Sequence, residues 1–155
     1  MARVGSPRST APGTSEGRVA HWPQPQAGDI VWCHFPHLPG LEPGPKPRPA
    51  LVVKVFADFA PSYVVLVAYG TSQNVNRLRA GEFAVTNSDG MAFTQAGLVY
   101  ETKFSFNQIV ELPYTSSYFK APPGSVPHLS PRLGMLHATL MRKASAAWSA
   151  ANSHR

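Results

Sequence analysis

Apolar residues gather in short runs between residues 29 and 112, and these runs have the length and composition of β-strands. Along the first run both alternating faces are largely apolar, and His34 faces the same way as Trp32, so we expect this strand to be covered on both sides. The Val, Leu, Ile and aromatic content of the runs predicts strands at 29–35, 50–56, 63–69, 83–85, 98–104 and 108–112.

Residues 131–150 instead have the periodicity of an α-helix. Apolar residues recur there at spacings of three and four, Ser130 can cap the helix, and Pro131 suits its first position. We therefore predict a mainly β fold with a C-terminal helix, in which five or six short strands form a small barrel. The barrel and helix make a single domain over residues 27–150, and 151–155 form a tail.

The runs at 50–56 and 63–69 form a predicted hairpin whose register can be deduced. A turn centred between Phe59 and Ala60 makes the numbers of directly opposed residues sum to 119, which places Arg48 opposite Thr71. Opposed residues on one face have Cβ atoms about 4.5 to 5.5 Å apart. We therefore expect Arg48 and Thr71 to share one pocket at the open end of the hairpin, unless a bulge shifts the register.

A proline-rich loop precedes Arg48 and gives this residue a stiffened approach to its strand. Prolines at 43, 45, 47 and 49 fix their own φ angles and push the residues before them towards extended conformations, which excludes a helix. A guanidinium held in this way suits a phosphate, because it presents a planar fork of donors and stays charged. The alternative interpretation is that Arg48 pairs with Glu42 across the loop.

Composition limits the choice of function class. The chain has 155 residues with 43% hydrophobic and 14% charged, which fits one loop-rich domain. Its net charge of +6 comes from the ends, since residues 27–130 hold seven basic and seven acidic side chains. The basic balance is therefore weak evidence for a nucleic-acid site in the core. Residues 1–26 are rich in Ser, Pro, Gly and Ala and predict a disordered leader.

The location expected from the sequence is the cytoplasm. Cys33 is the single cysteine and cannot form an internal disulfide, which fits a reducing compartment. No apolar segment follows the first basic residues, so a signal peptide is not expected. The longest uncharged apolar run, 63–69, is too short to span a bilayer.

Several other side chains are candidates for chemistry or binding near the Arg48 loop. His34 and His37 titrate near neutrality and are candidate proton acceptors, although an exposed loop histidine is the alternative. Their H-x-x-H spacing lacks further ligands, so we expect no metal and no cofactor. Cys33 faces the apolar side of its strand and is a poor nucleophile candidate. Possible donors or phosphate partners are Lys46, Ser72, Gln73, Arg77 and Arg79, and possible stacking partners are Trp32, Phe35 and Tyr69.

The order and spacing of these pieces resemble the PemK and MazF family of toxin endoribonucleases. The resemblance covers roughly residues 27–150 and is carried by GDIVW at 28–32, Gly40 and Glu42, RPALVV at 48–53, and the Thr71-Ser72-Gln73 run. This chain departs from the family in its loop, where Gly40-Leu41-Glu42-Pro43 replaces the usual Gly-Ser-Glu-Gln.

The resemblance implies an SH3-like barrel, a homodimer, and metal-independent cleavage of single-stranded RNA as part of a toxin–antitoxin pair. It also implies a cognate antitoxin protein that occupies the RNA channel. By position, Arg48 matches the catalytic arginine of the family and Thr71 its catalytic threonine. His34, His37, Glu42, Lys46, Ser72, Gln73 and Arg77 are then expected to bind RNA. The alternative function is an SH3-like binding module that engages RNA or a protein without cutting.

Overall fold

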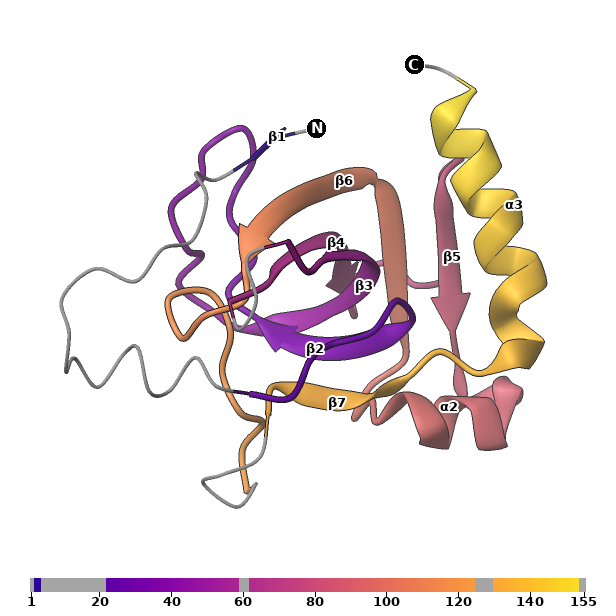
Figure 1. Cartoon of the computed structure of the whole chain (residues 1–155). Coiled ribbons are helices and arrows are strands. Elements are labelled where there is room, and N and C mark those ends of the chain that lie inside the picture. Colours follow the sequence, from indigo (N-terminus) through magenta and orange to yellow (C-terminus); the bar gives the residue numbers. More distant parts are fainter. Residues whose placement is uncertain (1, 4–21, 59–61, 125–129, 154–155) are drawn as a thin grey trace, which may run out of the picture.

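A single curled sheet forms most of the molecule (Figure 1). The computed structural model describes residues 2–3, 22–58, 62–124 and 130–153. The strands are β1 (Ala2–Arg3), β2 (Asp29–Cys33), β3 (Arg48–Phe56), β4 (Val64–Thr71), β5 (Glu82–Val85), β6 (Thr102–Pro113) and β7 (Arg132–Met135). The helices are the short 3₁₀ segments η1 (Asn87–Asp89) and η2 (Ala138–Leu140), and the α-helices α2 (Met91–Ala96) and α3 (Met141–Asn152).

The strand order is β1-β6-β4-β3-β2-β7, and β5 pairs with β6 outside this path. All pairs are antiparallel except that of β1 with β6. In Figure 1 the sheet curls into a half-barrel, and α3 runs beside β5. The predicted mainly β architecture with a C-terminal helix, of the small SH3-like barrel type, is confirmed.

Apolar side chains fill both faces of the sheet. On one face, Ile30 and Phe104 pack with residues of α2 and α3. On the other, Val31 and Cys33 pack with Phe119 and the segment around it. Because Ile30 and Val31 are both fully buried, the prediction that the first strand is covered on both sides is confirmed.

The predicted register of the β3–β4 hairpin is also confirmed at its open end. Ala50 pairs with Tyr69 and Val52 with Val67, so the residue numbers sum to 119. A register shift follows between Val52 and Lys54, on the side away from Arg48. The bulge therefore leaves the geometry at the open end unchanged. The predicted turn between residues 59 and 60 lies outside the described residues.

The C-terminal helix begins later than predicted. Residues 132–135 form β7, which pairs with Asp29 and Ile30 of β2, and α3 begins only at Met141. Residues 132–135 are extended because they pair with β2 and lie close to α2. The space there is so small that a Cβ added to Gly134 would lie 2.2 Å from the Gln95 carbonyl oxygen. This close approach of β7 to α2, itself a helix that the sequence analysis did not predict, fits an extended Gly134 without a side chain.

Two further predictions need correction. Residues 102–104 of the strand predicted at 98–104 and the strand predicted at 108–112 belong to one strand, β6, because both halves pair with β4 across a register shift between Ala68 and Tyr69; residues 98–101 precede it. The leader predicted to be disordered over 1–26 contains described structure at both ends. Ala2 and Arg3 pair with β6, and the Trp22 ring packs edge-on against Tyr114 at 5.4 Å between ring centroids. Residues 4–21 lie outside the described part of the chain.

Candidate functional site

Arg48 is the first residue of β3, and an aromatic ring holds its guanidinium. The Arg48 Cζ atom lies 5.8 Å from the centroid of the Tyr69 ring. Phe35 packs edge-on against the same ring, with centroids 5.3 Å apart. Among the described residues Arg48 and Glu42 form no ion pair. A cation–π contact leaves the in-plane N–H donors of the guanidinium free for another acceptor.

Thr71 ends β4 on the neighbouring strand, and its side chain is largely buried. Its Oγ1 accepts a hydrogen bond from the Gln73 backbone N–H at 3.1 Å. The hydroxyl proton therefore remains available for donation to a ligand. Gly70 permits the close packing before it, since a Cβ there would lie 2.3 Å from the Pro49 carbonyl oxygen. Arg48 and Thr71 are thus held on tightly packed strands.

Lys103 of β6 pairs with Thr71 of β4, and the β3–β4 register, continued outward from the Ala50–Tyr69 pair, brings Arg48 to the same level. The Lys103 ammonium donates to Glu82 Oε1 at 2.9 Å and to the Arg77 carbonyl oxygen at 3.1 Å. Only 10% of the Lys103 side chain is exposed, so this ion pair is largely shielded from water. Lys103 therefore fixes the segment that carries Arg77 against the sheet.

Arg48 and Thr71 both line a cavity of about 570 Å³, which we name the cationic cavity. Four of its described lining residues are Lys or Arg, and one, Glu82, is an acid. Among the described residues, Lys103 forms an ion pair with Glu82, and the three arginines form none. The positive charge of the cavity exceeds its negative charge, which favours an anionic ligand. The lining consists of Arg48, Tyr69, Thr71, Gln73, Asn74, Arg77, Leu78, Arg79, Glu82, Lys103, Ser105 and Gln108.

Arg48 and Thr71 also line a second cavity of about 620 Å³, which we name the central cavity. Lys46, Ser72 and Gln73 lie in its wall together with Trp32, Tyr100 and Arg132. Its lining contains no Asp or Glu among the described residues. The indole Nε1 of Trp32 is buried there without a hydrogen-bond partner.

The structure therefore brings together Arg48, Thr71, Lys46, Ser72, Gln73 and Arg77 of the residues predicted from the sequence, but not the two histidines and Glu42. His34 Nδ1 lies 2.9 Å from the Gly44 carbonyl oxygen and ties the proline-rich loop to β2. His37 and Glu42 line a separate hollow of about 360 Å³ within that loop. Neither histidine lines the cationic or the central cavity.

Cys33 is enclosed by the core and has no access to these cavities. Its side chain is fully buried in the apolar cluster on the far face of β2. Burial raises the pKa of the Cys33 thiol far above its ordinary value, so the thiol stays protonated and unreactive. The burial of Cys33 agrees with the prediction, made from its position on the strand, that it is a poor nucleophile candidate.

Lys103 and Tyr100 were not singled out from the sequence. Lys103 carried a usable signal, because it is the one basic residue in the apolar run 98–104 and a buried charge requires a partner. Tyr100 gave no such signal, because the pattern of residues 98–104 predicts a strand in which the aromatic side chain would pack inside the protein. In the structure Val99 and Tyr100 precede β6, and they are 81% and 71% exposed.

Comparison with known proteins places this arrangement in a family. The sequence model of the PemK-like, MazF-like toxin of type II toxin–antitoxin systems matches residues 26–144. No curated protein matches the chain. Within the described residues, no helix combines the length and apolar character needed to cross a membrane.

Proposed function

The chain belongs to the PemK-like, MazF-like family of toxins from type II toxin–antitoxin systems, and on that premise we propose that it is a metal-independent endoribonuclease acting on single-stranded RNA. The observation that carries the proposal is the convergence of Arg48 and Thr71 on one cavity with an excess of positive charge. Family membership also implies an antitoxin partner. We infer in addition a cytoplasmic homodimer.

RNA carries its own nucleophile, and this sets what the protein must supply. The 2′-hydroxyl attacks the adjacent phosphorus, the bond to the 5′-oxygen breaks, and the products are a 2′,3′-cyclic phosphate and a 5′-hydroxyl. The protein has to align these atoms and stabilise the charge that develops on the phosphorane oxygens. No metal is needed for either task.

Arg48 and Thr71 are suited to these two tasks. The guanidinium supplies a positive charge and paired N–H donors towards the non-bridging oxygens. The Thr71 hydroxyl donates to a phosphate oxygen while its own oxygen accepts from Gln73 N–H. Arg48 does not act as a base, because a guanidinium hardly deprotonates. We therefore assign both residues to alignment and charge stabilisation, with Arg77 and Arg79 holding the flanking phosphates.

Incubation of the purified chain with a long single-stranded RNA in EDTA tests the proposal. We expect cleavage that leaves 2′,3′-cyclic phosphate and 5′-hydroxyl ends. Arg48→Ala is expected to slow cleavage by at least about a hundredfold, since removal of one preorganised donor typically costs about 10² to 10³ in rate. Arg142→Ala is the matched control, because Arg142 lies on α3 and lines neither cavity.

Three results would contradict the proposal. Products with 3′-hydroxyl and 5′-phosphate ends would require a hydrolytic mechanism. Cleavage that survives in Arg48→Ala would place the chemistry elsewhere. Intact RNA with retained binding would identify a module that engages RNA without cutting it.

A further inference from the structure

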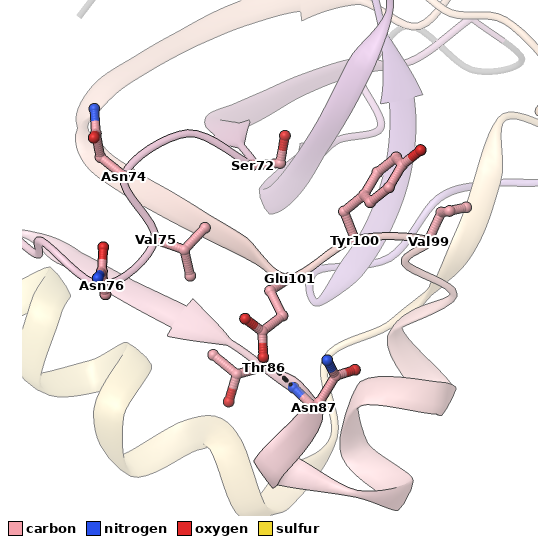
Figure 2. Close-up of a pocket in the computed structure, with 9 residues that line it drawn as sticks. All are labelled: Ser72, Asn74, Val75, Asn76, Thr86, Asn87, Val99, Tyr100 and Glu101. Carbon is pink, nitrogen blue, oxygen red and sulfur yellow. Dashed lines mark hydrogen bonds between the residues drawn. The ribbon is translucent and has the colours of Figure 1, made fainter.

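A third cavity, of about 720 Å³, lies beside the central cavity and differs from it in charge. Its described lining contains no Lys or Arg and a single carboxylate, Glu101. The side chains of Asn74, Asn76 and Asn87 supply amide groups at its rim (Figure 2). A phosphate is disfavoured beside an uncompensated carboxylate, whereas a neutral polar group with N–H donors is favoured. We name this space the amide-lined cavity.

Ser72, Val99 and Tyr100 line both the amide-lined cavity and the central cavity, so they form the ridge between the two. The central cavity holds Arg48 and Lys46 and favours the RNA backbone. A nucleotide that crosses this ridge therefore places its phosphate among cations and its base beside Glu101. The charges of the two cavities therefore favour the phosphate of a nucleotide on one side of the ridge and its base on the other.

Tyr100 is exposed although its segment is firmly anchored. Leu98 is buried in the core, and Thr102 Oγ1 donates to the Tyr100 carbonyl oxygen at 2.8 Å. Glu101 Oε2 accepts from the Asn87 backbone N–H at 2.8 Å, which joins the segment to η1 (Figure 2). An anchored aromatic ring beside a cationic track is the arrangement that binds unpaired bases by stacking.

Glu101 adds a means of distinguishing bases. One carboxylate oxygen is engaged by Asn87, and the other has acceptor capacity for a donor in the cavity. Adenine, cytosine and guanine each carry an exocyclic amino group, whereas uracil has none. A carboxylate accepts from such an amino group, as Glu and Asp do from cytosine.

We propose that the amide-lined cavity binds a nucleobase that lies next to the scissile phosphate and donates its amino group to Glu101, and that Tyr100, whose ring points away from Glu101 in Figure 2, stacks on the adjoining base of the same strand. The ligand is an amino-bearing base of single-stranded RNA. This proposal rests on the proposed nuclease function and specifies which nucleotide the site reads.

Binding to 2′-O-methyl oligonucleotides tests the cavity without cleavage, because the nucleophile is blocked. We expect the wild-type chain to bind oligoadenylate and oligocytidylate more tightly than oligouridylate by fluorescence anisotropy. Tyr100→Ala is expected to weaken binding by at least about fivefold, in keeping with the loss of one stacked base, and Tyr100→Phe to preserve it. Glu101→Gln is expected to narrow the difference between oligocytidylate and oligouridylate. Met91→Ala, which removes a side chain that is also 71% exposed but lies on α2, is the control.

Cleavage mapping on a random-sequence RNA separates this inference from the nuclease proposal. If the wild-type chain cuts and Tyr100→Ala and Glu101→Gln cut with unchanged rate and base preference, the base site is overturned and the nuclease assignment stands. If the wild-type chain does not cut but the binding series behaves as expected, the nuclease assignment fails and the base site stands. If both variants bind RNA normally yet escape inhibition by the antitoxin, the cavity is a protein-binding site and the inference is wrong.

Discussion

At the scale of single residues, the Thr71 hydroxyl is the group whose role is simplest to isolate. Valine has nearly the same shape as threonine but cannot donate a hydrogen bond, so Thr71→Val removes one interaction with little change in packing. We expect Thr71→Val to lower the cleavage rate by about a hundredfold or more, as for other preorganised donors, and Thr71→Ser to retain most activity. Single-turnover cleavage of RNA measures both rates, and thermal unfolding checks that the two variants fold equally well.

The positions of side chains were predicted well from the sequence around Arg48 and poorly around the histidines. The register arithmetic placed Arg48 opposite Thr71 because it depends only on strand pairing, and the bulge in β3 falls beyond the open end. The site expected around His34 depended on the path of the proline-rich loop. That loop turns back on itself, so that the His34 backbone accepts from Gly44 N–H at 3.1 Å. Such a path is set by tertiary contacts that residue spacing does not encode.

At the scale of elements, Asp89 joins η1 to α3. Its Oδ2 accepts from the Thr86 backbone N–H at 2.7 Å and lies 3.3 Å from the Lys143 ammonium. Burial by itself would raise the pKa of Asp89, but the Thr86 N–H and the Lys143 charge outweigh burial and lower the pKa. We expect Asp89→Asn to reduce the free energy of unfolding by about 0.5 kcal/mol at neutral pH, because the amide oxygen can still accept from Thr86 N–H while the charge attraction to Lys143 is lost.

The pH dependence of that loss follows from the sign of the pKa shift. A carboxyl with a lowered pKa in the folded state stabilises the protein above the unfolded-state pKa of about 3.9, and this contribution disappears as the pH falls through the folded-state pKa. Urea unfolding at neutral and acidic pH measures the effect, with Asp58→Asn as the control for an exposed carboxyl. A difference between Asp89→Asn and the wild-type chain that persists in strong acid would contradict the assignment.

The start of the C-terminal helix was predicted wrongly because strand pairing outweighs the local pattern there. The recurrence of Leu133, Leu136 and Leu140 suits a helix, but Leu133 lies in β7 because that segment gains backbone pairing with β2. Local propensity is a weak preference that such pairing readily overrides. The central strands and the later part of the helix were predictable because period and tertiary burial agree there, as for Ala144 and Ala147 on the buried face of α3.

At the scale of the whole molecule, the local charge of the cavities indicates the binding face, whereas the net charge of the chain does not. Residues 27–130 are formally neutral, yet the cationic cavity gathers four basic side chains around one acid. Lys103 is engaged by Glu82 and serves as support, whereas the side chains of Arg77 and Arg79 are exposed at the rim. The sequence did not reveal this grouping because Arg48, the Arg77–Arg79 pair and Lys103 lie far apart in the chain and come together only when the sheet curls.

This distribution makes the salt dependence of RNA binding a test of the face as a whole. Each phosphate contact on a single strand releases counterions and contributes about 0.7 to the slope of log K against log salt concentration. We expect the double variant Arg77→Gln/Arg79→Gln to bind a 2′-O-methyl RNA more weakly at low salt, with a slope smaller by about 1.4, because two contacts are lost. Arg142→Gln on α3 removes a charge from outside the cationic cavity and should leave the slope unchanged. Equal slopes for the double variant and the wild-type chain would mean that the RNA backbone follows another face, because the loss of a direct phosphate contact must reduce the number of counterions released on binding.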